Sequence, residues 1–217
     1  MKKSVLIIGM GRLGSHLAEK MQDLGHDVMI LDNKEERIAR LATRFSDARI
    51  AEYTHEDVLS ALDIPSFDIC FITVGDNLEA SMLTTITLKN LGAKYVAARA
   101  RDDIQCELLK KIGADEIIYA DGETADKLAI RHNANNIFDY VALTDGYAIF
   151  EVPIVKAWEG KSIIELDVRK KYKINIIAIK RGEHLDPSPM PDFVFAEGDH
   201  IFVIGKSRDV FKMSAKT

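Results

Sequence analysis

Residues 4–32 read SVLIIGMGRLGSHLAEKMQDLGHDVMILD, and this stretch decides the fold. A short apolar run is followed by Gly9, Gly11 and Gly14 in the spacing G-x-G-x-x-G, then by a helical pattern and a second apolar run ending at Asp32. Strand, glycine turn, helix and strand in this order predict a dinucleotide-binding βαβ unit. The glycines permit a tight turn and close backbone approach, and the helix N-terminus offers free N–H groups to a phosphate.

Two side chains in this stretch narrow the choice of nucleotide. Asp32 stands where the fingerprint places a ribose-binding acid, and its carboxylate would repel a 2′-phosphate, so we expect NADP to be disfavoured. Arg12 leaves the loop beside the phosphate position, where a guanidinium can make forked contacts to phosphate oxygens. Because backbone N–H groups largely serve a pyrophosphate, the extra arginine favours a terminal phosphate, as in ATP or ADP. A solvated surface arginine is the alternative.

The rest of the first 120 residues alternates short apolar runs with helical patterns. Runs this apolar indicate strands buried on both faces, and hence a doubly wound parallel sheet of Rossmann type between two helical layers. The predicted strands are 5–8, 27–31, 48–51, 68–74, 95–98 and 116–119, and the predicted helices are 11–24, 34–45, 56–62, 77–91 and 102–112. In the turns after three of these helices, Gly25, Gly92 and Gly113 are available as left-handed C-caps.

Strand ends add further binding candidates, because strand C-termini line the ligand crevice of such sheets. Arg99 ends the fifth strand, Gly75-Asp76-Asn77 follows the fourth, and Thr54 follows the third, although Thr54 or His55 could instead be a helix N-cap. The predicted nucleotide-binding residues are Gly9, Gly11, Arg12, Leu13, Gly14, Asp32, Asn33, Thr54, Gly75, Asp76, Asn77 and Arg99.

The pattern changes after residue 119. Residues 122–136 predict one more helix, which we assign to a first domain of residues 1–136. Residues 137–217 then predict a small α+β domain, with strands at 147–154, 174–180 and 200–204 and helices at 162–168 and 207–213. A lobe of this size is small for independent stability, so we expect it to dimerise.

Composition excludes several classes of protein. The 217 residues carry a net charge of −5 with scattered Lys and Arg, which gives no general reason to bind nucleic acid. No apolar segment approaches the roughly 20 residues that span a bilayer, and the N-terminal apolar run is too short for a signal peptide. Cys70 and Cys106 are interpreted as free thiols. We therefore expect a cytoplasmic protein whose membrane role, if any, needs a partner.

Enzyme motifs are missing as well. The sequence has no Walker lysine motif, H-E-x-x-H, C-x-x-C or nucleophile elbow. The histidines of the second lobe, His184 and His200, show no partner in the sequence and are interpreted as surface residues. We expect a binding protein rather than an enzyme. An NAD-dependent oxidoreductase is the alternative, and an NAD(H)-sensing transcription regulator is a weaker one, since no helix-turn-helix is visible.

An ordered set of segments resembles one family. GMGRLGSHLAEKMQDLGHDVMILD, TVGDNLEASMLTTITLKNLGAKYVAARA and KIGADEIIYADGETADKLA in the first lobe, and the second-lobe stretch from Trp158 to Lys206 with its S-I-x-x-L-x-x-R-x-x-Y and E-G-D patterns, resemble RCK domains (regulators of K⁺ conductance). The likeness is to the KtrA/TrkA type and covers essentially the whole chain. It implies a nucleotide-gated cytosolic subunit whose homodimers assemble into an octameric ring beneath a membrane K⁺-translocating subunit (KtrB/TrkH-like), at the inner face of the plasma membrane.

The resemblance also implies ligands and residue roles. ATP and ADP bind KtrA-like members, and NAD or NADH binds TrkA-like ones; Arg12 matches an arginine that meets the terminal phosphate, and Arg99 a basic position at the fifth strand. A family acid that helps bind Mg²⁺ or Ca²⁺ is replaced by the shorter Asp121, which could equally cap the next helix. Some KtrA-like C-terminal lobes bind cyclic di-AMP, and the matching positions, which would serve equally as interface core, are Ile163, Ile164, Asp167, Arg169, Asn175, Ile176 and Pro191.

Overall fold

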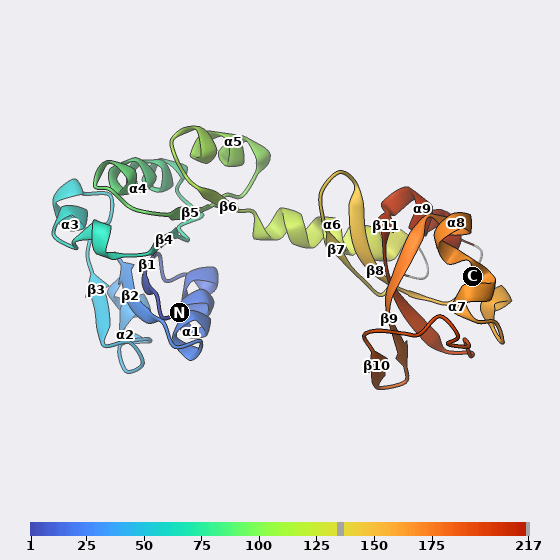
Figure 1. The fold of residues 1–217 in the computed structure, drawn as a ribbon. Coiled ribbons are helices and arrows are strands. Elements are labelled where there is room, and N and C mark those ends of the chain that lie inside the picture. Colours follow the sequence, from blue (N-terminus) through green and yellow to red (C-terminus); the bar gives the residue numbers. More distant parts are fainter. Residues whose placement is uncertain (134–136, 216–217) are drawn as a thin grey trace. The chain divides into compact units, whose positions relative to one another are not determined.

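The computed structural model describes residues 1–133 and 137–215, and the chain divides into two compact units, Met1–Gly122 and Glu123–Thr217 (Figure 1). Helix α6 (Ala120–Asn133) runs across the boundary between them. It begins two residues earlier than predicted, and its predicted end at residue 136 lies outside the described residues, as does the proposed domain boundary there.

The first unit is built on a six-stranded parallel sheet in the order β3-β2-β1-β4-β5-β6. This order, with a switch point between β1 and β4, confirms the doubly wound fold predicted from the strand–helix alternation. The strands are β1 (Ser4–Ile8), β2 (Asp27–Asp32), β3 (Asp47–Ile50), β4 (Ile69–Ile72), β5 (Val96–Arg99) and β6 (Glu116–Ile118). The helices are α1 (Arg12–Asp23), α2 (Glu35–Ala39), α3 (Glu56–Ser60), the 3-10 turn η1 (Ile64–Ser66), α4 (Leu78–Asn90) and α5 (Asp103–Lys111).

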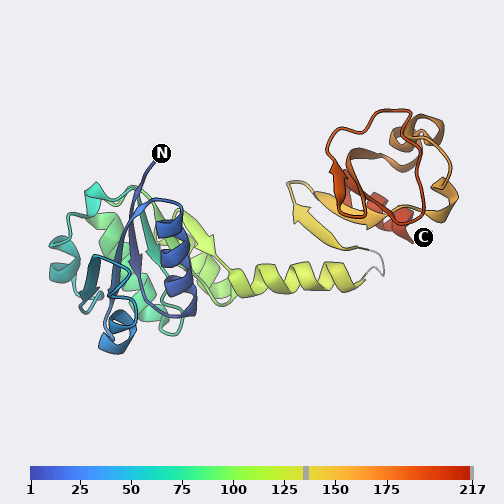
Figure 2. The ribbon, with the colours of Figure 1, turned by 90° about the horizontal axis from the view of Figure 1, so that it is seen from below.

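The central strand β1 is apolar on both faces because it serves two cores. Val5 and Ile7 pack with the residues of α1 and α2, whereas Leu6 and Ile8 pack with those of α3, α4 and α5. Successive side chains of a strand point to opposite faces, so four consecutive apolar residues are the local requirement for a sheet covered on both sides. Figure 2 shows α1 along one of these faces.

Glycines end three helices as predicted. Gly25, Gly92 and Gly113 have φ values of 86°, 85° and 110°, the left-handed region open to glycine. The predicted helix 34–45 is wrong beyond Ala39, because the chain tightens into turns there, with the Leu41 N–H donating to the Ile38 carbonyl at 2.9 Å.

The second unit is an α+β fold on a five-stranded antiparallel sheet in the order β10-β9-β11-β8-β7, as the sequence predicted in class. The strands are β7 (Asp139–Ala142), β8 (Tyr147–Pro153), β9 (Ile174–Arg181), β10 (His184–Asp186) and β11 (Asp199–Lys206). The other elements are the 3-10 turn η2 (Lys156–Trp158), α7 (Ile163–Leu166), α8 (Val168–Tyr172) and α9 (Ser207–Ser214). Strands β7 and β10 and helix α8 were not predicted.

Two sequence-based exclusions can be compared with the structure. In the parts of the chain that the structure describes, no helix has the length and apolar character needed to cross a bilayer. Cys70 and Cys106 are both free, as predicted, with Cys70 buried in the sheet of the first unit.

A buried carboxylate fastens the second sheet. Asp199, fully buried at the start of β11, accepts two hydrogen bonds from the Arg181 guanidinium at 2.6 Å each and one from the Ala196 N–H at 2.8 Å. Burial raises the pKa of Asp199, but these hydrogen bonds outweigh it and hold the pKa below its usual value. The interaction therefore stabilises the unit above about pH 4, the unfolded pKa, and fades as pH falls through the lower folded value.

Replacing Asp199 should consequently weaken the second unit. We expect Asp199→Asn to lower its free energy of unfolding by about 1–3 kcal/mol at pH 7, because hydrogen bonds to a charged group are lost. Urea unfolding followed by the fluorescence of the only tryptophan, Trp158, buried in this unit's core, measures the change. The exposed neighbour Glu197→Gln is the control. An Asp199→Asn effect that is as large at pH 3 as at pH 7 would contradict this account.

Candidate functional site

The glycine loop brings α1 against the sheet with no space for a side chain. A Cβ on Gly14 would collide with the Gly9 carbonyl and with the hydroxyl of Thr73, and Gly9 itself has a φ of 100°. The Thr73 hydroxyl donates to the Gly9 carbonyl at 2.5 Å, tying the loop to the end of β4. Gly11, by contrast, is the N-cap of α1 and has nothing within 4 Å of its Cβ position. The open side of the loop is therefore at Gly11.

Asp32 lies at the end of β2, directly under the loop. Its Oδ2 accepts hydrogen bonds from the Met10 N–H at 2.5 Å and from Nη1 of Arg37 at 3.1 Å, and its Oδ1 accepts one from the Lys34 N–H at 2.8 Å. The side chain is fully buried. Sequence reasoning placed the acid but missed Arg37, which covers it.

A second cation lies at the rim made by β4 and β5. The Arg99 guanidinium crosses over Gly75, where a Cβ would stand 2.8 Å from Nη1, so a larger residue there would displace the guanidinium. Arg99 Nη2 lies 3.5 Å from the Asp121 carboxylate. The Arg99 Nε is buried and has no hydrogen-bond partner among the described residues, so it is free to donate to a bound water, ion or ligand. Its neighbour Arg101 pairs with Asp76 at 3.5 Å.

The remaining candidates occupy the same edge of the sheet. Asn77 is the N-cap of α4, and its side chain accepts the Ala80 N–H at 3.1 Å. Asn33 and Thr54 both donate to Glu52, at 2.9 and 3.0 Å. The hydrogen bond from Asn33, with that from Thr54, lowers the pKa of Glu52 although partial burial opposes it. Sequence analysis named Asn33 and Thr54 as candidates but missed Glu52, although Glu52 directly follows the predicted third strand.

The structure shows where the two candidate N-cap positions lie, one before α3 and one at α6. His55, and not Thr54, occupies the N-cap position of α3, without a side-chain hydrogen bond. Asp121 lies inside the first turn of α6 rather than before it, where an acid still favours the helix dipole. The described residues contain no group of three or more His, Cys, Asp or Glu able to hold a metal ion. The Asp121 side chain is mostly exposed, and its carboxylate lies 3.5 Å from Arg99 Nη2.

The two predicted arginines belong to different surroundings. Arg12 lines a cavity of about 400 Å³ together with Met10, Gly11, Ser15, Arg37 and Arg40. Arg99 is not among the residues around this cavity and lies against Gly75 instead. One protomer therefore presents two separate cationic positions beside the glycine loop.

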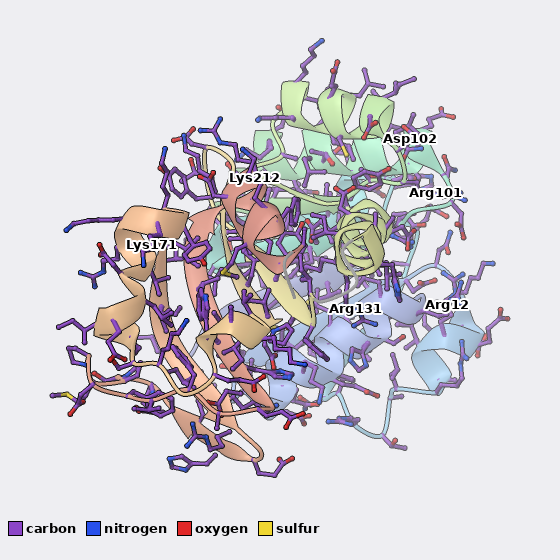
Figure 3. The ribbon with its side chains drawn as sticks, turned by 90° about the vertical axis from the view of Figure 1, so that its right-hand side faces the viewer. Arg12, Arg101, Asp102, Arg131, Lys171 and Lys212 are labelled. Carbon is purple, nitrogen blue, oxygen red and sulfur yellow. The ribbon has the colours of Figure 1, made fainter. Side chains whose placement is uncertain are left out.

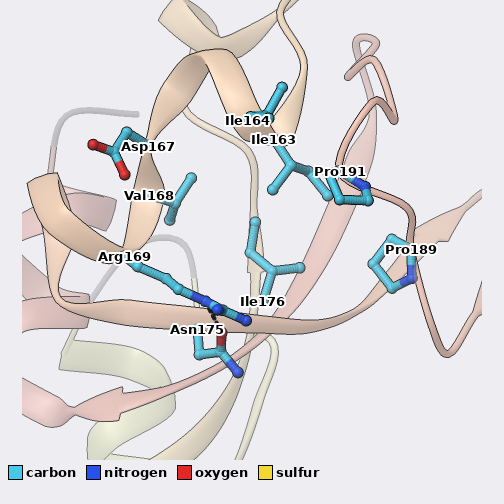
Figure 4. Close-up of a pocket in the computed structure, with 9 residues that line it drawn as sticks. All are labelled: Ile163, Ile164, Asp167, Val168, Arg169, Asn175, Ile176, Pro189 and Pro191. Carbon is cyan, nitrogen blue, oxygen red and sulfur yellow. Dashed lines mark hydrogen bonds between the residues drawn. The ribbon is translucent and has the colours of Figure 1, made fainter.

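The second unit holds a pocket of about 290 Å³, shown in Figure 4. It brings together all seven residues proposed for a cyclic dinucleotide and adds two, and its lining is Ile163, Ile164, Asp167, Val168, Arg169, Asn175, Ile176, Pro189 and Pro191. The Arg169 Nε donates to Asn175 Oδ1 at 2.6 Å across its floor.

Local geometry shapes this pocket. Ser162 and Glu165 form a reciprocal capping box that starts α7, and Asp167 adopts a left-handed φ of 45° that ends it and begins α8. The predicted single helix 162–168 is thus broken at Asp167. The break leaves apolar Ile164 67% exposed on one side of the pocket, and the Arg169 guanidinium lies on the other side beside Ile176 (Figure 4). An apolar wall next to a cation suits a base attached to a phosphate.

His200 is not the plain surface residue that the sequence analysis predicted. His200 is half-buried, with Nδ1 at 3.0 Å from a Glu151 carboxylate oxygen and its ring 4.4 Å from that of Phe138. The partner was invisible in the sequence because Glu151 is on the adjacent strand β8. His184 is exposed on β10.

Comparisons with known proteins agree over both units. The TrkA-N domain family matches residues 5–120, and the TrkA-C domain family matches residues 147–216. The chain is 34% identical over 216 residues to the Ktr system potassium uptake protein C of Bacillus subtilis, covering 100% of this chain and 98% of that protein. It is 34% identical over 208 residues to the Ktr system potassium uptake protein A of the same organism, covering 96% and 94%.

A solved structure shares the fold. The GsuK channel bound to NAD superposes with a TM-score of 0.71 at 18% identity, covering 99% of this chain and 40% of that chain.

The glycine loop offers a direct test of this geometry. We expect Gly14→Ala to lower the free energy of unfolding of the first unit by about 1–3 kcal/mol, because the methyl group overpacks a site with no space. Gly11→Ser should leave stability within about 0.5 kcal/mol of wild type, since serine is a favourable N-cap, yet should weaken nucleotide binding at the open side. Calorimetric unfolding and nucleotide titration measure both effects. Equal stability of the two variants would refute the packing argument.

Proposed function

Because this chain belongs to the family of proteins that combine a TrkA-N with a TrkA-C domain, we propose that it is a nucleotide-binding regulatory subunit of a K⁺-uptake system. The observation that carries the proposal is the full-length likeness to two Ktr potassium uptake proteins, together with a glycine loop open at Gly11 above a buried Asp32. Its role is to bind and signal rather than to catalyse.

The first unit supports an adenine nucleotide as the ligand. The loop and the N-terminus of α1 receive phosphate, Asp32 lies where ribose hydroxyls are held, and Asn33, Glu52 and Thr54 stand along the adjoining edge. Arg99, with its unpaired Nε, supplies a donor for the distal phosphates of ATP or ADP. NAD(H) is the alternative, since Asp32 suits any unphosphorylated ribose.

The ion pair between Arg99 and Asp121 connects this site to α6. A phosphate bound to Arg99 competes with the Asp121 carboxylate, which belongs to the first turn of that helix. Nucleotides with different numbers of phosphates would then differ in how strongly they break the Arg99–Asp121 ion pair at the start of α6. A ligand shifts a conformational equilibrium only by the difference between its affinities for the two conformations. If Mg²⁺ or Ca²⁺ takes part, Asp121 supplies one ligand, and the cation neutralises phosphate charge.

The likeness to the Ktr proteins supports a proposal for the assembly and for the partner. The outward face of the first unit exposes Leu83 and Ile86 on α4 and Ile104 on α5, at 45%, 38% and 73% of their surface. Apolar side chains of this size, exposed on neighbouring helices, favour association into a homo-oligomer such as the expected octameric ring. The ring would act at the inner face of the plasma membrane on a K⁺-translocating subunit of the KtrB/TrkH kind.

The second unit supports a further regulator. Its pocket combines isoleucines with Arg169 and Asn175, a chemistry that fits the adenine and phosphate of cyclic di-AMP. Binding there would regulate the same assembly from a second site.

Phosphate sensing by Arg99 can be measured directly. We expect Arg99→Ala to weaken ATP binding about tenfold while AMP binding falls much less, because only the distal phosphates lose a charge-assisted partner. Titration calorimetry with both nucleotides gives the ratio, and Arg101→Ala, two residues along the same rim, is the matched control. Equal losses for ATP and AMP would refute the assignment.

The second pocket has its own test. Arg169→Ala should reduce binding of cyclic di-AMP by about tenfold or more, since a guanidinium–phosphate contact and its hydrogen bond to Asn175 are removed. Lys170→Ala, an adjacent and exposed basic residue, should bind as wild type does, and ATP binding should be unchanged in both variants. If Lys170→Ala lowers affinity as much as Arg169→Ala, the ligand is held by general charge and not by this pocket.

A further inference from the structure

Basic side chains gather on one part of the second unit, around α8 and α9. Residues 168–173, which form α8 and its C-cap, read VRKKYK, with four basic residues and no acid. Strand β11 ends in a further lysine, and α9, which packs against α8, carries two more basic residues. We call this set the basic patch, and its members are Arg169, Lys170, Lys171, Lys173, Lys206, Arg208 and Lys212. The charges come from separate segments of the chain, and the fold brings them together.

A hollow of about 400 Å³ opens in the basic patch where α8 meets α9. Its lining is Lys171, Tyr172, Lys173, Asp209, Lys212 and Met213. Figure 3 shows Lys171 on α8 and Lys212 on α9. Lys173 ends α8 with a left-handed φ of 58°, a conformation that costs energy in a residue other than glycine. Lys173 also lines a neighbouring hollow with Arg169, so the positive charge is continuous from one hollow to the next.

The protein itself neutralises little of this charge. The Asp167 carboxylate lies 3.7 Å from the Lys170 ammonium. The Asp209 carboxylate, on a mostly buried side chain, lies 3.8 Å from the Nε of Arg208. The three lysines that line the hollow are exposed, and the described residues give none of them an ion pair. Their mutual repulsion is relieved when an anion binds among them.

We propose that the basic patch is a docking surface for the headgroups of anionic phospholipids, by which the second unit binds the membrane surface. The inference goes beyond the proposed function and takes from it only the location at the inner face of the plasma membrane. Clusters of roughly four to eight Lys and Arg are attracted to the negative potential of such a surface. The attraction acts within a Debye length, so it needs exposed charges like those of the patch.

The composition of the patch favours a lipid surface over a nucleic acid. Most of its members are lysines, and a lysine carries a compact charge on a flexible stem that can follow mobile headgroups without a fixed geometry. Binding of single-stranded nucleic acid also uses exposed aromatic rings on which bases stack. Tyr172 in the hollow is only half-exposed and packs edge-on against Trp158. Tyr147, beside the patch, has the Lys206 ammonium over its ring at 5.3 Å.

The test measures flotation of the full chain, without a membrane partner, on two kinds of vesicle: pure phosphatidylcholine, and phosphatidylcholine with an equal part of phosphatidylglycerol. We expect binding to the anionic vesicles alone, weakening as salt rises. Removing Lys171 and Lys212 together, as the double variant to alanine, should lower the partition coefficient by about fivefold for each lysine. The matched control replaces Lys156 and Lys161, exposed lysines of the same unit outside the patch, and should lose less than about twofold. Unchanged urea unfolding, followed by Trp158 fluorescence, shows that each variant is folded.

Four results would overturn the proposal. If the anionic vesicles do not retain the protein, the patch is no lipid surface, while titration with ATP tests the nucleotide-binding function separately. If both double variants lose binding equally, the vesicles attract the whole unit and not the patch. If glycerol 3-phosphate at the same phosphate concentration displaces the vesicles, the hollow holds a free phosphate ester. If a single-stranded oligonucleotide binds at a salt concentration where the vesicles do not, the patch is a nucleic-acid surface.

Discussion

The contact between Gly14 and the Gly9 carbonyl is the constraint on which the first unit depends. It lets α1 begin directly against β1, and the Thr73 hydroxyl closes the same contact from β4. Because the helix starts this close to the sheet, its free N–H groups, the end of β2 and the end of β4 face one crevice. Any side chain at residue 14 would push α1 outward and separate these groups.

The chemistry of the crevice depends on where its acidic and basic side chains lie. Asp32 is buried and accepts hydrogen bonds from the backbone N–H groups of Met10 and Lys34. The cations are divided into two places, with Arg99 over Gly75 and Arg12 beside Arg37 and Arg40. Under the proposed function, a nucleotide at the glycine loop would meet cations at both places, and the Arg99–Asp121 ion pair joins one of them to the first turn of α6.

Prediction succeeded where local pattern and tertiary environment agree. The apolar runs of the parallel strands, the glycine caps and the glycine loop each specify their own conformation, so the order of elements in the first unit was predictable. It failed where a short element depends on a distant partner. Strand β7 pairs with β8, and three of its four residues are exposed, so its sequence shows no alternating apolar pattern. The break at Asp167 needs a left-handed aspartate, a conformation that the sequence does not signal.

By itself, the sequence determined the fold class and placed the glycine loop and Asp32 at the ends of the first two strands, because these follow from glycine spacing and from apolar runs along the chain. Only the tertiary structure decided which charges meet. Arg37 covers Asp32, Glu52 joins Asn33 to Thr54, and Arg99 pairs with Asp121. Such pairings depend on strand order and on helix placement, and long side chains reach across elements that are separate in the chain. The hydrogen-bond partners of Asp32 could therefore not be foreseen from its position in the sequence alone.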